Sequence, residues 1–462
     1  MSILTRLWKF LTPTKAIEMS NGYYETLFFE SLYRVTYMAG LSFFDKSILY
    51  LLYSYTVKTM IVMFVVCELW YLFSQTSNLD LIIDNINVTL IHLIAMYRYR
   101  IMLNHMPTFQ KLTRAMEAEM FDISTPERRK LVDFWQDRSE IYLKMLLGLG
   151  TCTLATWYVY PLVDDLEYNL TVAVRLPIEY KSPIIYPIAY IIVLVAFNYT
   201  SYFVMVNDLI MQVTLMHILC QYSVLADCFE NILNDIDKIE YLGEEWKVKY
   251  LDRLGRLVNH HKFLIDNCTE LKDILSVPML FQFAASGMLI CFAAYQVTAT
   301  VTISIAKFLM SVQYMCYNMF ELFIFCRWCD EIRVQSENIR NAAYYSGWER
   351  GPSSLRGVRA RLMLVMTRAS KPIVMSAGGL YGLTLESYTA VNIIITAPRI
   401  QISSPSLLKM SLRDWDWVGV PNITPFFSAE SQRAIIHLLI TVPRTQRPRP
   451  PLLEMGLPEH IK

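Results

Sequence analysis

Seven apolar segments of membrane-spanning length are the strongest constraint on how this chain folds. They cover about residues 54–73, 80–98, 141–160, 184–206, 277–298, 307–326 and 373–395. About 20 apolar residues suffice for an α-helix to cross the hydrocarbon core of a bilayer, and a helix satisfies its own backbone hydrogen bonds there. The second segment is the weakest, because Asp80 and Asp84 stand at its start, where an interfacial position would hydrate them. The chain is therefore predicted to be an all-α, polytopic membrane protein with seven transmembrane helices.

The content of charged residues agrees with this class and argues against others. Only 18% of the 462 residues are charged, whereas soluble proteins average about 25%. The net charge of +1 gives no attraction to nucleic acid. The sequence has no Gly-x-Ser-x-Gly, His-Glu-x-x-His or P-loop motif, and Cys326-x-x-Cys329 lacks the second pair of a zinc finger. We therefore expect no enzyme activity, no cofactor and no metal site.

The distribution of Lys and Arg predicts the orientation in the membrane. The segments between spans two and three, four and five, and six and seven are rich in basic residues. Residues 74–79 and 299–306 contain none, and residues 161–183 contain only Arg175 and Lys181. Because basic loops stay in the cytosol, the N-terminus is predicted to be cytosolic, which is inverted relative to G-protein-coupled receptors. Asn169, in the sequon "YNLTV" of the outer loop, is the predicted glycosylation site.

The predicted cytosolic segment 223–276 has helical apolar periodicity. Two stripes recur every three or four residues: Leu225, Phe229, Ile232, Ile236 and Ile239, then Leu251, Leu254, Val258, His261, Leu264 and Leu271. They predict amphipathic helices that continue spans four and five beyond the membrane. The stripes either pack on each other or form a contact between subunits. For the pair His260-His261, a solvated helix face is favoured over a metal site or a proton switch.

Aromatic and weakly polar side chains gather in the predicted outer halves of spans three, four and six. The predicted ligand-binding residues are Thr153, Trp157, Tyr160, Tyr186, Tyr190, Met310, Gln313, Tyr314 and Tyr317. An apolar pocket with few polar groups suits small, volatile or lipophilic ligands; the alternative is an interfacial aromatic belt with ordinary helix packing. Glu321 and Glu386 are ionisable at membrane depth, so they are expected to face a partner or water rather than lipid.

Two stretches near the C-terminus resemble the insect odorant receptor family. "ELFIFCRWCDEIRVQSENIRNAAYYSGWE" (321–349) is similar to the end of its sixth span, and "RARLMLVMTRASKPIVMSAGGLYGLTLESYTAV" (359–391) resembles its signature. The first match rests on Cys326, Ser336-Glu337 in swapped order, Ala343, Tyr344 or Tyr345, and Trp348. The second rests on Leu362, Leu364, Lys371, Pro372, Ala377, Gly378, Leu383, Leu385, Glu386 and Tyr388.

The resemblance implies an odorant-gated, non-selective cation channel subunit in the plasma membrane of olfactory sensory neurons. In the family, four subunits pack through the cytosolic parts of helices four to seven, span seven lines the pore, and a tuning subunit assembles with a shared co-receptor. The co-receptor has a long insert between spans four and five. Residues 223–272 lack such an insert, so the resemblance implies a tuning subunit in a heterotetramer, with a small volatile ligand. It also places Glu386, Tyr388 and Asn392 on the pore helix.

These expectations divide the chain into seven parts. They are a cytosolic N-terminal segment (1–53), spans one to four with the ligand-binding outer half (54–222), cytosolic amphipathic helices (223–276), spans five and six (277–326), a cytosolic anchor loop (327–371), an incomplete pore-lining helix (372–396) and an atypical proline-rich tail (397–462). Pro398 breaks a helix and Arg399 follows it at once. The tail is therefore expected to be disordered, or to come from a mispredicted gene end that replaces the family's outer gate.

Two other functions remain open at this stage. A gustatory-type chemoreceptor channel would share the architecture but bind another class of ligand, and the Leu-x-Leu-Glu sequence at 383–386 argues against it. A metabotropic seven-helix receptor would need an extracellular N-terminus, which the distribution of basic residues opposes.

Overall fold

The computed structural model describes residues 3–20, 22–74, 79–163, 168–236, 243–300 and 305–390. The described residues are helical apart from loops and one short hairpin, which confirms the predicted all-α class. The long helices are α4 (Ile48–Ser74), α5 (Leu79–Asn104), α7 (Pro126–Val163), α8 (Tyr186–Glu230), α9 (Glu244–Thr300) and α10 (Ile305–Tyr344). Shorter helices are α1 (Ile3–Leu11), α2 (Lys15–Glu18), α3 (Tyr23–Met38), α6 (Met106–Thr113) and α11 (Val358–Ala369). Single 3₁₀ turns are η1 (Ala115–Glu117), η2 (Asn234–Ile236), η3 (Trp348–Arg350) and η4 (Pro352–Ser354).

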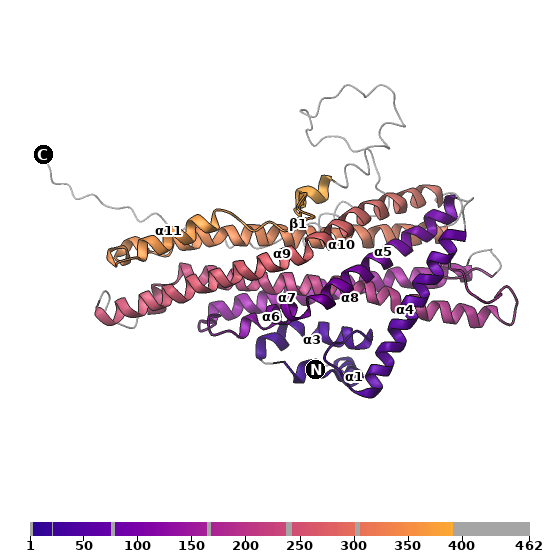
Figure 1. Ribbon diagram of the computed structural model, residues 1–462, viewed down its shortest axis with the longest axis horizontal. Helices are drawn as coiled ribbons and strands as arrows, with labels where there is room; N and C mark the ends of the chain where they lie inside the picture. Colours follow the sequence, from indigo (N-terminus) through magenta and orange to yellow (C-terminus); the bar gives the residue numbers. More distant parts are fainter. Residues whose placement is uncertain are drawn as a thin grey trace, which may run out of the picture. The chain divides into compact units, whose positions relative to one another are not determined.

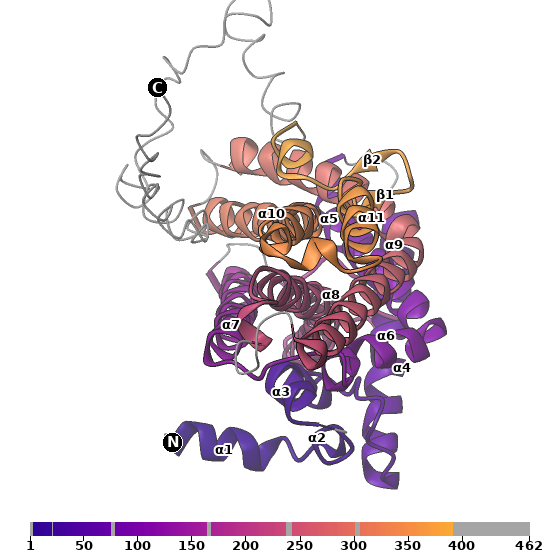
Figure 2. The ribbon, with the colours of Figure 1, turned by 90° about the vertical axis from the view of Figure 1, so that its left-hand side faces the viewer.

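Helix α8 forms the centre of the helical bundle. It packs against α3, α4, α5, α7, α9 and α10, and Figure 2 shows it surrounded by α7, α9 and α10. Nearly every residue from Phe203 to Phe229 is buried, on all faces of the helix. A helix that is apolar all round belongs in the interior, so the sequence of α8 accounts for its central position.

The N-terminal helices attach to the same centre. Phe28 and Phe29 on α3 are buried, and both rings contact His217 of α8 with ring centroids 5.4 and 5.3 Å apart. Helix α4, in contrast, crosses the other long helices obliquely (Figure 1). It begins at Ile48, earlier than the predicted start at residue 54, because its apolar surface continues outward through Ile48 and Leu49.

Four of the described helices are long and apolar enough to cross a membrane: α4, α8, α9 and α10. Helices α5 and α7 cover the second and third predicted spans as continuous helices, but each also carries several charged residues. As predicted, the helices of spans four and five continue well past the apolar segments, since α8 ends at Glu230 and α9 begins at Glu244. Phe229 and Leu254, from the two stripes, are fully buried.

The pair His260-His261 differs from its predicted environment. Both side chains are buried on α9 rather than solvated, with exposed fractions of 1% and 4%. Burial, together with the neighbouring His261 and Arg253, lowers the pKa of His260 to about 4. The imidazole is therefore neutral at physiological pH, in a packed region of the protein.

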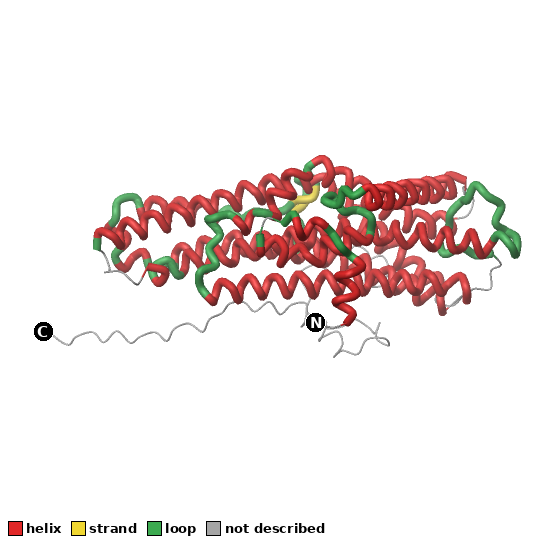
Figure 3. Tube along the Cα trace, turned by 90° about the horizontal axis from the view of Figure 1, so that it is seen from below, coloured by secondary structure: helices red, strands yellow, loops and turns green. Residues whose placement is uncertain are grey.

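The largest difference from the sequence prediction concerns the predicted pore helix 372–396. Instead of a helix beginning at Pro372, the chain is extended and then forms an antiparallel hairpin of β1 (Ser376–Ala377) and β2 (Tyr381–Gly382), yellow in Figure 3. Gly378 and Gly379 have φ of 61° and 72°, which favour glycine and end a right-handed helix. Helix resumes only at residues 385–390, where the Thr384 hydroxyl accepts a hydrogen bond from the Ser387 N–H at 3.2 Å as an N-cap.

The hairpin is attached to α9 and α10. The Gly378 N–H donates to the Ser276 carbonyl at 2.7 Å, and the Ile373 N–H donates to the Ser336 hydroxyl at 3.0 Å. Small residues at 376–379 were expected to lie within a membrane helix, yet they allow this close contact with α9. Asn392 and the atypical tail 397–462 lie outside the described residues.

Candidate ligand-binding site

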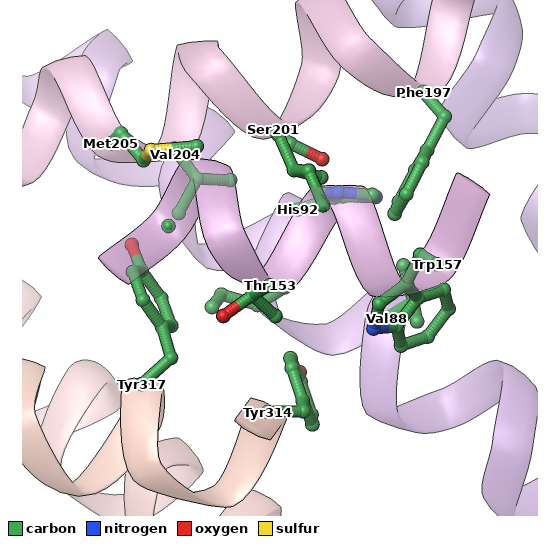
Figure 4. Close-up of a pocket in the computed structure, with 13 residues that line it drawn as sticks. Val88, His92, Thr153, Trp157, Phe197, Ser201, Val204, Met205, Tyr314 and Tyr317 are labelled. Carbon is green, nitrogen blue, oxygen red and sulfur yellow. The ribbon is translucent and has the colours of Figure 1, made fainter. Parts of the chain in front are cut away.

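A cavity of about 50 Å³ lies between α5, α7, α8 and α10, and we call it the central cavity (Figure 4). It is lined by Val88, Ile91, His92, Gly150, Thr153, Leu154, Trp157, Phe197, Ser201, Val204, Met205, Tyr314 and Tyr317. The side chains are mostly apolar or aromatic, with a few polar atoms among them. This composition is typical of a site for a small, largely apolar molecule.

Aromatic rings form the walls of the central cavity. Trp157 of α7 packs against Phe197 of α8, with ring centroids 5.5 Å apart, and meets Tyr314 of α10 edge to face at 5.9 Å. Tyr314 is held in place because its hydroxyl donates to the Asn87 carbonyl at 2.8 Å. The rings thus have defined positions before any ligand enters.

Gly150 lets α7 come close to its neighbours at the edge of the cavity. A Cβ atom at this position would collide with the Met205 sulfur and lie 3.3 Å from Tyr317 Cε2. A glycine on α7 therefore leaves room for these two side chains to line the central cavity.

A second, more polar cavity of about 310 Å³ adjoins the first. Trp157 and Tyr314 line both cavities, so these two rings lie between them. Other residues of the second cavity include Asn169, Lys307 and Ser311. It is the larger and the more hydrophilic of the two spaces.

The nine predicted ligand-binding residues fall into three groups in the structure. Thr153, Trp157, Tyr314 and Tyr317 line the central cavity, and Tyr160 and Met310 join Trp157 and Tyr314 around the second. Tyr186, Tyr190 and Gln313 line neither. The Tyr186 hydroxyl donates to the Asn169 carbonyl at 2.5 Å and the Tyr190 hydroxyl to the Tyr158 carbonyl at 2.8 Å.

The sequence analysis missed a buried acid–histidine pair beside the central cavity. His92 of α5 lines the cavity, and its Nδ1 lies 2.9 Å from Oε2 and 3.1 Å from Oε1 of Glu68 on α4. The two side chains are 2% and 0% exposed. The sequence did contain a signal for this pair, because Glu68 and His92 are ionisable residues inside apolar spans, and such residues usually have a functional or structural partner.

A cluster of buried ionisable groups lies next to the cavity. Arg98 of α5 donates from Nη1 to Asp208 Oδ1 of α8 at 2.6 Å and to Gln282 Oε1 of α9 at 3.0 Å. Gln282 Nε2 donates to Glu321 Oε1 at 2.6 Å. Glu321 is one helical turn from the cavity residue Tyr317, so this polar network ties four helices together directly beside the site.

Glu321 was expected to face a partner rather than lipid, and it does: it is 1% exposed and bonded to Gln282. Two residues of the predicted pore helix, Glu386 and Tyr388, lie in the short helical stretch 385–390. The Tyr388 ring meets Phe323 of α10 edge to face, with centroids 5.6 Å apart. Tyr388 also packs on the buried core of Ile290, Leu322 and Cys326.

A second ionic cluster lies in the predicted cytosolic region. The fully buried Arg128 contacts Asp122, Asp227 and Asp235 at 2.8–3.0 Å. Burial raises the pKa of Asp122, but the Ser124 N–H together with Arg253 and Arg128 outweighs this effect and lowers it. Arg253 of α9 donates to Asp122 and Asp235 as well, so the cluster fixes the ends of α7, α8 and α9 to one another.

Comparison with known proteins places this geometry in a family. A sequence model described as "7tm Odorant receptor" matches residues 78–393. The chain is 27% identical over 135 residues to odorant receptor Or2 of Anopheles gambiae, covering 29% of this chain and 34% of that protein. It is 20% identical over 265 residues to odorant receptor 22c of Drosophila melanogaster, covering 51% and 64%. The first of these matches thus spans about a third of the relative's length.

A solved structure shows the same fold over almost its whole length. The olfactory receptor OR5 of Machilis hrabei, in complex with eugenol, superposes with a TM-score of 0.69, covering 81% of this chain and 98% of that one at 17% identity. A second structure of the same receptor gives a TM-score of 0.68. The seven-helix membrane fold predicted from the sequence is therefore confirmed, and the matched proteins are receptors rather than enzymes.

Proposed function

The chain belongs to the 7tm odorant receptor family, and from this premise we propose that it is the ligand-tuning subunit of an odorant-gated cation channel. In this proposal it is a multi-pass protein of the plasma membrane of olfactory sensory neurons. It detects small volatile molecules and assembles with a shared co-receptor into a heterotetramer. We also propose that binding of the odorant opens the channel.

The observation that carries the proposal is the central cavity. It is enclosed by four helices of the bundle and lined by aromatic rings with defined positions. It also includes Thr153, Trp157, Tyr314 and Tyr317, which sequence alone selected as ligand contacts. We propose these four as the ligand-binding residues, with Tyr160 and Met310 of the second cavity on the entry side.

The assembly part of the proposal rests on other regions. The long extensions of α8 and α9, with α10 and α11, offer a large helical surface for contacts between subunits, with Val248, Met363 and Leu364 exposed on it. Residues 385–390 begin the proposed pore segment, with Glu386 and Tyr388 on it. We propose a cytosolic N-terminus and an extracellular, glycosylated Asn169, in agreement with the distribution of basic residues.

Electrical recording with cavity variants tests the function. The chain is co-expressed with an odorant receptor co-receptor, and currents are recorded while a panel of volatile compounds is applied. Trp157→Ala and Tyr317→Ala are expected to change the ranking of agonists at normal surface expression. Tyr190→Ala is the matched control, because Tyr190 lines neither cavity, and it should leave the ranking unchanged. A ranking that is identical in all three variants would contradict the assignment of the central cavity.

A further inference from the structure

The pair of His92 and Glu68 constrains which protons the central cavity presents. The carboxylate of Glu68 occupies the Nδ1 side of the imidazole, at 2.9 and 3.1 Å. Nε2 is then the ring nitrogen that remains for a bound molecule. Phe64 and Phe197 also contact the imidazole ring in T-shaped arrangements, with centroids 6.1 and 6.4 Å away.

The number of protons shared by His92 and Glu68 determines whether Nε2 is a hydrogen-bond donor or an acceptor. Both side chains are almost completely buried, and a buried pair with a net charge is unfavourable compared with a neutral one. A neutral carboxyl group beside an imidazole protonated at Nδ1 is also neutral overall, but its carboxyl proton would have no acceptor among the described residues, since Nδ1 of His92 is the group that contacts both Glu68 oxygens. Two neutral forms remain: an imidazolium beside a carboxylate, or a neutral imidazole that accepts the carboxyl proton at Nδ1. The two forms differ only in where the shared proton sits. In both of them Nε2 carries a hydrogen and is a donor.

Trp157 supplies a second donor of the same kind. Its Nε1 is buried and has no hydrogen-bond partner among the described residues, and an indole N–H can only donate. Trp157 and His92 both pack against Phe197, so the two rings lie on neighbouring sides of the cavity (Figure 4). A buried donor without a partner is costly to leave unpaired. A ligand that accepts a hydrogen bond would relieve this cost.

We propose that the central cavity selects small, mainly apolar molecules with one acceptor oxygen, such as a ketone, aldehyde or ester carbonyl, and that His92 and Trp157 are the donors. This inference rests on the proposed function, because it takes the central cavity as the ligand site. A carbonyl oxygen has two lone pairs and no proton of its own, so it can satisfy both donors. A hydrocarbon satisfies neither, and sites with unpaired polar groups reject such analogues strongly.

The test compares carbonyl compounds with analogues of the same shape. Two series replace the C=O group by C=CH₂ or by a secondary or primary alcohol: cyclohexanone, methylenecyclohexane and cyclohexanol, and benzaldehyde, styrene and benzyl alcohol. These six compounds are applied, within a wider panel of volatile ketones, aldehydes, esters, alcohols and hydrocarbons, to cells expressing the chain with its co-receptor. We expect carbonyl compounds to be the most potent agonists. Each should be at least about tenfold more potent than its C=CH₂ analogue, the value of one hydrogen bond.

Variants then assign the effect to the two donors. His92→Phe and Trp157→Phe keep an aromatic ring but remove the N–H. In each variant the half-maximal concentration should rise about tenfold more for the carbonyl agonists than for their C=CH₂ analogues. His217→Phe is the matched control, because His217 is a buried histidine of α8 that lines neither cavity. It should leave the ratio of the two potencies unchanged even if expression falls.

The outcomes separate this inference from the proposed function. If alcohols or hydrocarbons are the most potent agonists, or if both Phe variants keep the wild-type ratio, the donor assignment is wrong while the receptor function stands. If no compound in the panel evokes a current, although a control receptor responds in the same cells, the proposed function fails and the ligand class fails with it.

Discussion

Removing Arg98 should destabilise the protein strongly, and removing Asp208 with it should restore much of the loss. Arg98 is 2% exposed and bonds both Asp208 and Gln282, with Glu321 3.9 Å away. Its guanidinium also lies over the Phe325 ring, 5.4 Å from the centroid. In Arg98→Leu, the Asp208 carboxylate, 1% exposed, would lose its cation and could not regain water.

The magnitude follows from the burial of both partners. Breaking a buried ion pair by deleting one member costs about 3–5 kcal/mol, whereas replacing both members by apolar residues is often neutral or stabilising. We therefore expect a loss of about 3–5 kcal/mol for Arg98→Leu and a similar loss for Asp208→Leu. The double variant should lose far less than the sum. Glu321 would keep its hydrogen bond from Gln282, so the rest of the network can remain in place.

Heating steps followed by size-exclusion chromatography of the detergent-solubilised complex measure this effect. Both single variants should lower the temperature at which the intact peak is lost and reduce surface expression, and the double variant should recover most of both. Arg256→Leu is the control, since its pair with Asp252 is solvent-exposed, with exposed fractions of 56% and 64%, and such pairs contribute little. Additive losses in the double variant would refute the account of a coupled buried pair.

Three further predictions concern the cavity, the buried histidines and the hairpin. Gly150→Ala should reduce the potency of the bulkier agonists in dose–response recordings at normal expression, because the new methyl group displaces the Met205 side chain toward the cavity. The stability of the protein, followed by thermal unfolding, should fall as the pH drops from about 6.5 toward 4. Burial holds the pKa of His260 at about 4 in the folded protein, so the unfolded chain takes up the proton first. His260→Leu should reduce this dependence of stability on pH. Gly378→Ala should lower the free energy of unfolding by at least about 1–2 kcal/mol because of the positive φ at this position. The new Cβ would also lie 2.6 Å from Leu280 Cδ2, which is a clash. The variant should therefore give smaller currents, and a fully active variant would show that the hairpin can rearrange.

The sequence predicted the helices well because apolar length and helical period are local properties. The central position of α8 also follows from its own residues, which are apolar on every face. The hairpin at 376–382 was missed because small residues fit a close helix contact and a tight turn equally well. The pair Gly378-Gly379 after Pro372 indicates a turn. The prediction of a helix followed instead from the length of the apolar segment.

The candidate site was predictable only in part, for a physical reason. Thr153 and Trp157 share a face of α7, and Tyr314 and Tyr317 share a face of α10, so helical spacing alone selects them. His92 and Glu68 lie on different helices, as do Arg98 and Asp208, and nothing in the local pattern brings them together. Only the packing of the bundle shows that these four buried side chains are partners.

A structure of the complex with bound ligand tests the central claim most directly. The chain, assembled with its co-receptor and saturated with the strongest agonist from the panel, would be imaged by electron cryo-microscopy. The account predicts ligand density in the central cavity, between Trp157, His92 and Tyr317, with its oxygen toward the two ring N–H groups. Ligand density confined to another site, with the central cavity unchanged, would contradict it.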